Sequence, residues 1–165
     1  MVTLTPVQTQ ADIRALAAAA DQVWHEYFRS LLSPEQIDYM VEKFQSIPAI
    51  TQQIREGFQY FLLREDDQVA GYTGIHLEEP RLFLSKLYVL QPYRKKGYSS
   101  LMLQKLLEIA KNAGKSAIYL TVNKYNTPSI DIYLHKGFQT IDSVVTDIGK
   151  GFVMDDYIME RTIDC

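Results

Sequence analysis

The chain has 165 residues and a formal net charge of −3 at pH 7, with 47% apolar and 22% charged residues. This length suits one folded domain with a substantial core, which we assign to residues 1–165, and the composition excludes disordered and fibrous classes. No apolar run approaches the ~18 residues of a membrane-spanning helix, no signal-peptide pattern is present, and basic residues form no extended block. We therefore expect a soluble cytoplasmic protein with no nucleic acid and no membrane among its partners.

Cysteine and histidine usage limits the available chemistry. The only cysteine is Cys165, so a disulfide within the chain is excluded and a thiol nucleophile is not expected. The three histidines have no ligand-like spacing, so no metal site is expected.

The first third of the chain is predicted to be mostly helical. A short alternating strand over Val2–Thr9 precedes an amphipathic helix over Gln10–Phe28. Ser33 is predicted to cap a second helix that has Pro34 at its first position. Pro48 is expected to end or bend this helix, and a third short helix follows.

Two strands rich in Tyr, Phe, Leu and Val come next, over Gln59–Arg64 and Gln68–Leu77. They are predicted to form a hairpin around an acidic turn at residues 65–67. Gly71 and Gly74 interrupt the second strand, which predicts a bulge or the close approach of another group.

The central segment predicts a strand, an anion-binding loop, a helix and a second strand. An apolar run at Leu82–Leu90 leads into a basic loop at residues 94–100, and a strand is predicted at Ser116–Asn123. Between them, a helix with one apolar face ends at Gly114. The first turn of a helix presents unbonded N–H groups that favour an anion, so a pyrophosphate would fit this loop. A solvated surface loop is the plain alternative.

The last third predicts a helix followed by a closing hairpin. Thr127 is predicted to cap the helix, with Pro128 at its first position and Gly137 beyond its end. The hairpin strands are expected at residues 138–146 and 152–163. The predicted fold class is therefore α/β, with a mixed, mostly antiparallel sheet of six to seven strands and helices on both faces.

Several motifs in this order resemble those of one family. Leu87-Tyr88-Val89, Arg94-x-x-Gly97-x-Ser99, Asn126, Tyr133 and Gly137-Phe138 are similar to the signature of the GCN5-related N-acetyltransferases (GNAT superfamily). Segments 24–28 and 151–160 look most like the bacterial spermidine/spermine acetyltransferase branch. The resemblance implies a GNAT-like acyl-CoA N-acyltransferase fold and acetyl-CoA (coenzyme A) as cofactor. Ser99 stands where the family has glycine or alanine, and it is small enough to keep the loop backbone close to a phosphate.

The resemblance also implies roles for individual residues. The backbone of Leu87, Tyr88 and Val89 would bind the pantetheine arm between two splayed strands. The pyrophosphate would lie against the loop formed by Lys95, Lys96, Gly97, Tyr98, Ser99 and Ser100. Asn126 would hold the cofactor arm or order the start of the helix, two roles that the sequence does not separate. Tyr133 would contact the cofactor and act as the catalytic general acid, although its periodicity alone favours a packing residue.

The general base is not identified by the sequence. The family often has a glutamate on the strand that here holds Ser85 and Lys86, and this chain has no carboxylate there. The candidates that remain are Glu78, Glu79, Asp155, Asp156 and His76. Each could act directly or through a water molecule, and we expect the arrangement with water.

The predicted function is acetyl transfer from acetyl-CoA to a primary amine of a small molecule, a polyamine being one option. Two alternatives stay open: acetylation of a peptide or protein amino terminus, and a regulatory module that binds acyl-CoA without turnover. A homodimer is also left open.

Overall fold

The computed structural model describes residues 1–163 and contains a seven-stranded sheet in the order β1-β2-β3-β4-β5-β7-β6. Strands β4 and β5 pair in parallel, and the pairs β1–β2, β2–β3, β5–β7 and β6–β7 are antiparallel. The predicted fold class is therefore confirmed. Cys165 lies outside the described residues.

The chain forms two compact units, which we describe separately. The first unit comprises residues 1–76 and 86–106, and the second comprises residues 77–85 and the chain from Leu107 onward. The assignment of residues 1–165 to one domain stays a prediction.

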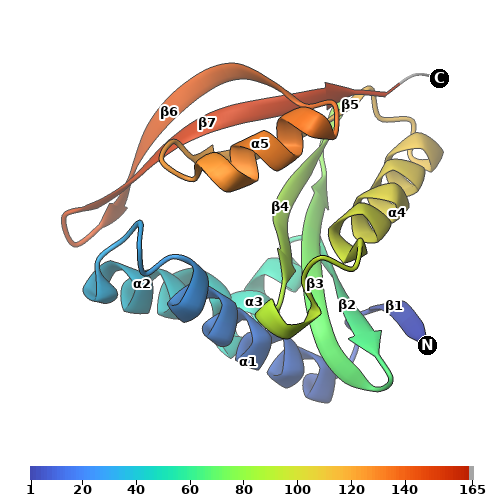
Figure 1. Cartoon of the computed structure of the whole chain (residues 1–165), viewed down its shortest axis with the longest axis horizontal. Coiled ribbons are helices and arrows are strands. Elements are labelled where there is room, and N and C mark those ends of the chain that lie inside the picture. The colour runs from blue at the N-terminus through green and yellow to red at the C-terminus, as the bar shows by residue number, and fades with distance from the viewer. Residues whose placement is uncertain (164–165) are drawn as a thin grey trace. The chain divides into compact units, whose positions relative to one another are not determined.

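The elements follow the predicted order (Figure 1). Up to the central segment they are β1 (Val2–Pro6), α1 (Gln10–Tyr27), α2 (Pro34–Met40), the π-helical η1 (Val41–Gln45), α3 (Ile47–Arg55), β2 (Phe58–Glu65) and β3 (Gln68–Leu77). The rest are β4 (Arg81–Val89), the 3-10 turn η2 (Gln91–Tyr93), α4 (Tyr98–Asn112), β5 (Ala117–Asn123), α5 (Thr127–His135), β6 (Gln139–Gly149) and β7 (Phe152–Thr162).

Side-chain caps begin the first three helices. Thr9 and Asp12 form a capping box at the start of α1, and the Ser33 hydroxyl accepts a hydrogen bond from the N–H of Gln36. Ser46 caps α3 in the same way, which places Pro48 in the first turn of that helix. The expectation that Pro48 ends or bends the second helix is therefore wrong, because proline needs no N–H partner in a first turn.

The β2–β3 hairpin has the close approaches that its glycines predict. Its register shifts between Leu63, opposite Gly71, and Arg64, opposite Val69, so β3 carries one extra residue. A Cβ on Gly71 would lie 2.5 Å from the backbone oxygen of Tyr88 on β4. A Cβ on Gly74 would lie 2.7 Å from the ring of Tyr60. Both glycines therefore admit a neighbour that any side chain would exclude.

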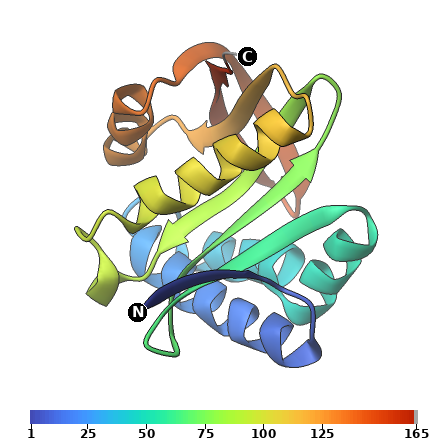
Figure 2. The same cartoon turned by 90° about the vertical axis from the view of Figure 1, so that its right-hand side faces the viewer.

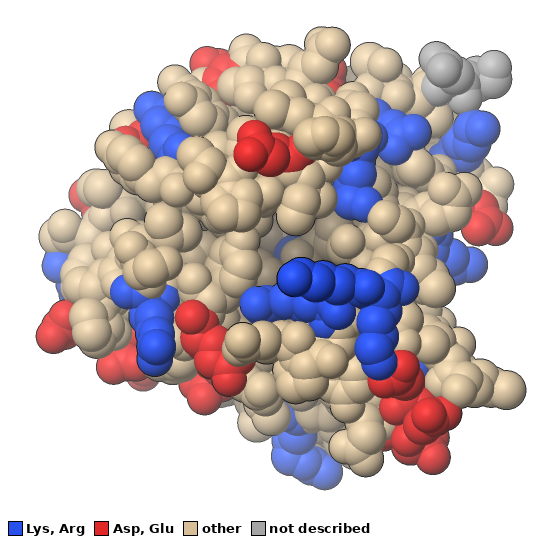
Figure 3. Space-filling view, viewed as in Figure 1, with Lys and Arg blue, Asp and Glu red and all other residues tan. Residues whose placement is uncertain are grey.

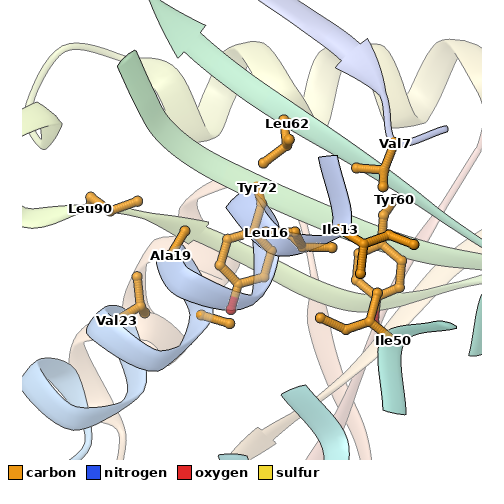
Figure 4. Close-up of a cluster of buried hydrophobic side chains, with 11 residues drawn as sticks. Val7, Ile13, Leu16, Ala19, Val23, Ile50, Tyr60, Leu62, Tyr72 and Leu90 are labelled. Atoms are coloured by element: carbon orange, nitrogen blue, oxygen red, sulfur yellow. The ribbon is translucent and has the colours of Figure 1, made fainter. Parts of the chain in front are cut away.

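Helices cover both faces of the strands in the first unit. Buried side chains from α1, α3, β2 and β3 form the larger cluster, which includes Leu16, Val23, Ile50, Leu62 and Tyr72 (Figure 4). On the other face, Tyr98 and Met102 of α4 pack against Leu63 and Ala70. Figure 2 shows β1 beside the β2–β3 hairpin, with α1 along one side of these strands. The predicted coverage of both faces is confirmed here.

The second unit is built on β5, β6 and β7. Strand β7 pairs with β5 along Ala117–Asn123 and with β6 along most of its length. Helix α5 joins β5 to β6, and Phe138, directly after it, is 1% exposed. Among the described residues, no helix is long and apolar enough to cross a membrane.

Candidate active site

The loop between β4 and α4 has the backbone of an anion site. Lys95 and Gly97 have φ angles of +65° and +80°, a region that favours glycine. The N–H of Leu101 donates to the oxygen of Gly97 at 3.1 Å, so the N–H groups of the preceding helical residues lie in the turn that lacks intrahelical partners. A Cβ built on Gly97 has no described atom within 4 Å, which leaves room for a bound group beside the backbone.

The three cations of this loop have different surroundings. The guanidinium of Arg94 donates from Nε to the oxygen of Val89 at 2.9 Å and lies 5.3 Å from the ring centre of Tyr27. Lys96 pairs with Glu65 at 3.1 Å. The exposed Lys95 side chain has no hydrogen-bond or ion-pair partner within the described part of the chain. Lys95 is therefore the cation of this loop best able to meet an anionic ligand.

Figure 3 shows Lys and Arg side chains grouped over the segment that joins β4 to α4. Glu65 partly offsets this charge. Its carboxylate accepts hydrogen bonds from the hydroxyl of Tyr98 at 2.6 Å and from Lys96, and these bonds hold the pKa of Glu65 below its ordinary value. The backbone of the loop, more than its total charge, therefore favours an anion.

The end of β4 leads directly into this loop. Leu87, Tyr88 and Val89 are half-buried. Tyr88 packs edge-on to Trp24, with ring centres 6.2 Å apart. The bond from Arg94 to Val89 ties the loop to the strand end. The structure therefore brings Leu87–Val89 and Lys95–Ser100 into one continuous part of the first unit.

Asn126 and Tyr133 belong to the second unit, Asn126 directly before α5 and Tyr133 within it. Asn126 is 5% exposed, and its side-chain oxygen accepts a bond from the N–H of Ser129 at 3.4 Å. It is therefore the helix cap, and the prediction that Thr127 caps this helix is wrong by one residue. Asparagine accepts such a bond well, and Pro128 still falls in the first turn.

Tyr133 is half-buried and packs edge-on to Phe138, with ring centres 5.4 Å apart. The N–H of Phe138 donates to the oxygen of Tyr133 at 3.0 Å, which fixes the chain beyond the helix. The ring contact with Phe138 restricts the phenol, as a packing residue or a proton donor would require.

Four of the five candidate bases are engaged elsewhere. Glu78 accepts a bond from the hydroxyl of Tyr119 at 2.5 Å, and Glu79 pairs with Lys115. His76 stacks on the ring of Phe58 with centres 4.6 Å apart.

The last two candidates are neighbours on β7. Asp155 pairs with Lys124 at 2.9 Å. Asp156 is 6% exposed, and burial, followed by the charge of Asp155, raises its pKa to about 6. The pKa of the Asp156 carboxyl group is thus shifted toward neutrality.

Lys86 is a buried cation that the sequence analysis did not single out. It is 7% exposed, and its Nζ donates to the hydroxyl of Tyr60 at 2.5 Å and to the side-chain oxygen of Gln53 at 3.3 Å. Burial lowers the pKa of Lys86 to about 8. A lysine inside an apolar strand was the available signal, but only the packed neighbours show that it is buried.

Comparison with known proteins identifies the family. A model of the acetyltransferase (GNAT) family matches residues 20–138. An uncharacterized N-acetyltransferase of Mycobacterium tuberculosis is 26% identical over 154 residues, which cover 92% of this chain and 98% of the relative.

Two solved structures share the fold. PaiA N-acetyltransferase from Thermoplasma acidophilum, solved with coenzyme A, has a TM-score of 0.84 at 20% identity and covers 98% of this chain and 99% of its own. The ribosomal-protein-S18-alanine N-acetyltransferase from Escherichia coli has a TM-score of 0.75 at 17% identity and covers 100% and 96%. The family match extends over most of the chain, so the chain belongs to the acetyltransferase (GNAT) family.

Proposed function

We propose that this protein transfers the acetyl group of acetyl-CoA to a primary amine of a small molecule. The observation that carries the proposal is the β4–α4 loop, where a helix N-terminus, a glycine with open space beside it and the exposed Lys95 meet. The coenzyme A bound by the similar PaiA acetyltransferase supports the choice of cofactor.

The residues of the first unit fit this cofactor. Bound acetyl-CoA supplies the acetyl group as a thioester. The N–H groups of Lys95–Ser100 hold its pyrophosphate, and the backbone of Leu87–Val89 binds the pantetheine arm. In this proposal the N–H of Val89 polarises the thioester carbonyl.

Tyr133 is the proposed general acid. A phenol is protonated at neutral pH, so Tyr133 can give its proton to the departing sulfur. Its packing on Phe138 restricts the ring, which lowers the cost of holding the hydroxyl in one direction. Asn126 supports this role by capping the helix that carries Tyr133.

The proposed acceptor group is a primary amine, because the alternative substrates share this group. Polyamines are the first class to test, because of the sequence resemblance to the spermidine/spermine branch. Peptide amino termini are the second, because the similar Escherichia coli structure is that of a ribosomal-protein-S18-alanine N-acetyltransferase.

The test is thiol release from acetyl-CoA with panels of polyamines, amino acids and peptides, combined with a Tyr133→Phe variant. This substitution keeps the ring and removes the proton donor, so kcat should fall roughly 10²–10⁴-fold while acetyl-CoA affinity stays within a few-fold. Tyr125→Phe is the matched control, because Tyr125 is 68% exposed in the same unit and should keep full activity.

Each other outcome has a clear meaning. A fully active Tyr133→Phe enzyme would remove this residue from the mechanism. A wild-type protein that binds acetyl-CoA but acetylates no amine would favour the regulatory module.

A further inference from the structure

Trp24 has a buried N–H group that lacks a hydrogen-bond partner. Its side chain is 7% exposed, and among residues 1–163 no group accepts a hydrogen bond from its Nε1. Burial raises the pKa of Tyr72 and the N–H of Trp24 opposes this rise, so the two groups are close without hydrogen-bond geometry. The hydroxyl of Tyr72 donates instead to the side-chain oxygen of Gln45, at 3.5 Å. Buried donors are nearly always satisfied, so the N–H of Trp24 calls for an acceptor that the described chain does not supply.

Lys86 lies in the same unit and brings a buried cation. Its Nζ donates to the hydroxyl of Tyr60 at 2.5 Å and to the side-chain oxygen of Gln53 at 3.3 Å, and both of these groups are uncharged. Burial raises the pKa of Tyr60, so its phenol stays protonated and gives the ammonium no counter-charge. Burial lowers the pKa of Lys86 to about 8, whereas a carboxylate beside it would raise that pKa. A buried cation in such surroundings favours an anionic ligand.

Aromatic rings connect Trp24 to Lys86 across β2, β3 and β4. The ring of Tyr88 lies 6.2 Å from the ring of Trp24 and 5.4 Å from that of Tyr72. Tyr60 adds to the rise that burial causes in the pKa of Tyr72, so these two hydroxyls are also close, and both rings lie in the cluster of Figure 4. Tyr88 is half-buried, so this group of side chains borders solvent near the end of β4. We call the group the polar layer, and it consists of Trp24, Gln45, Tyr60, Tyr72, Lys86 and Tyr88.

The helical segment that contributes Gln45 is irregular. This segment, η1, is a π-helix, and Gln45 is its last residue. The side chain of Gln45 is 3% exposed, and its oxygen accepts the bond from Tyr72. π-helical turns are rare and occur frequently at functional sites. The π-helix and the buried amide therefore fit a binding site better than a purely structural core.

We propose that the polar layer binds a carboxylate group of the acetyl acceptor, so that the acceptor is a small amine that also carries a carboxylate. This inference rests on the proposed function and narrows its substrate class. Lys86 and the N–H of Trp24 donate to the carboxylate, which gives Trp24 its missing partner and offsets the charge of the buried ammonium. A polyamine would instead bring a second cation to Lys86, and like charges repel strongly where water is excluded.

The position of Lys86 on β4 connects this subsite with acetyl transfer. Leu87–Val89, the proposed pantetheine-binding segment, directly follows Lys86 on the strand. Val89 lies about 10 Å farther along β4, a distance that a small molecule can span. A carboxylate bound at Lys86 therefore leaves the amino group of a short acceptor free to extend toward Val89, where the proposed function puts the thioester. All these residues belong to the first unit.

The first experiment uses the fluorescence of Trp24, the only tryptophan of the chain. Glycine, γ-aminobutyrate and ε-aminocaproate are titrated into the protein saturated with coenzyme A, and methylamine, butylamine, hexylamine and putrescine serve as probes without a carboxylate. At least one amino acid should change the emission of Trp24 saturably, because it bonds the indole N–H. It should also bind at least ~10-fold more tightly than the matched amine. This measurement needs no turnover.

The second experiment measures kcat and KM for the best amino-acid probe and its matched alkylamine. Lys86→Met removes the ammonium group, so the ratio of kcat/KM between the two substrates should fall roughly 10–100-fold, through KM. Trp24→Phe keeps an aromatic ring and removes the N–H, and it should lower the same ratio roughly 10-fold. Lys115→Met is the matched control, because Lys115 is also 7% exposed but lies in the second unit, and it should leave the ratio unchanged.

The outcomes separate this inference from the proposed function. Binding of alkylamines or putrescine as tight as that of the amino acids at every length would overturn the carboxylate subsite and leave the acetyltransferase in place. A Lys86→Met enzyme that loses kcat/KM equally with both substrates would assign Lys86 a structural role and would also overturn it. Should Lys86→Met not fold, an unchanged ratio in Trp24→Phe would have the same force. If Trp24 reports carboxylate binding but no amine is acetylated, the subsite stands and the proposed acetyl transfer is refuted.

Discussion

Lys86 gives a prediction whose sign changes with pH. Replacement by methionine keeps a long apolar side chain and removes the ammonium group. In the first unit, Lys86 is 7% exposed and donates to the hydroxyl of Tyr60 and the side-chain oxygen of Gln53. Tyr60 also donates to Gln53, so both acceptors keep one bond after the substitution.

The magnitude follows from the pKa of the buried amine. Burial lowers it from 10.5 to about 8, and roughly 1.4 kcal/mol per unit gives a charge-burial cost of about 3 kcal/mol. The charged form is disfavoured in the folded state, so the full cost applies below about pH 8 and is lost as pH rises from 8 to 10.5. The two hydrogen bonds offset about 2 kcal/mol at every pH.

We therefore expect Lys86→Met to be about 1 kcal/mol more stable than wild type at pH 7 and about 1 kcal/mol less stable near pH 10, where roughly 1 kcal/mol of the charge-burial cost remains. Urea unfolding at both pH values measures this difference, and effects of tyrosine ionisation common to both proteins cancel. Lys115→Met is the matched control. Lys115 is also 7% exposed, but it pairs with Glu79, so its loss should destabilise the protein at pH 7.

One result would refute this reasoning. If Lys86→Met is less stable than wild type at pH 7 by the same amount as at pH 10, the buried ammonium carries no penalty, and its contacts compensate its desolvation fully. The polar group formed with Tyr60 and Gln53 would then be a stabilising ion site.

Two further predictions concern glycines. Gly97→Val should weaken acetyl-CoA binding at least ~10-fold by calorimetry, because the valine side chain would occupy the space beside the loop N–H groups. Gly114→Val is the control, since Gly114 has a similar φ of +73° at the far end of α4, and this variant should leave affinity unchanged. Equal losses of affinity in both variants would show that backbone strain causes the effect. Gly74→Ala should lower the free energy of unfolding by roughly 1–3 kcal/mol, since its Cβ would meet the ring of Tyr60 at 2.7 Å; an alanine variant with wild-type urea midpoint would show that the ring moves freely.

Local patterns were enough to predict most elements. The apolar periodicity of α1 and α4, the caps at Ser33 and the acidic turn after β2 act over a few residues, so their structural effect is readable in the chain. The same holds for Gly97 in the β4–α4 loop, because the positive φ angle that favours glycine there is a local property of the backbone. The prediction was wrong where two neighbouring residues can both cap a helix, as Asn126 and Thr127 can at the start of α5.

Burial and partnership were decided by tertiary structure. Glu78, Glu79, Asp155 and Asp156 are indistinguishable as carboxylates in the sequence, yet strand pairing gives the first three a hydroxyl or ammonium partner and leaves Asp156 buried opposite Asn123. Lys86 likewise becomes a low-pKa amine only because α3 and β2 enclose it. The sequence by itself determined the order of elements, the anion-binding loop and the family resemblance, because these depend on neighbours along the chain. The ionisation of individual side chains was decided by the fold, because desolvation and charge pairing depend on residues distant in sequence.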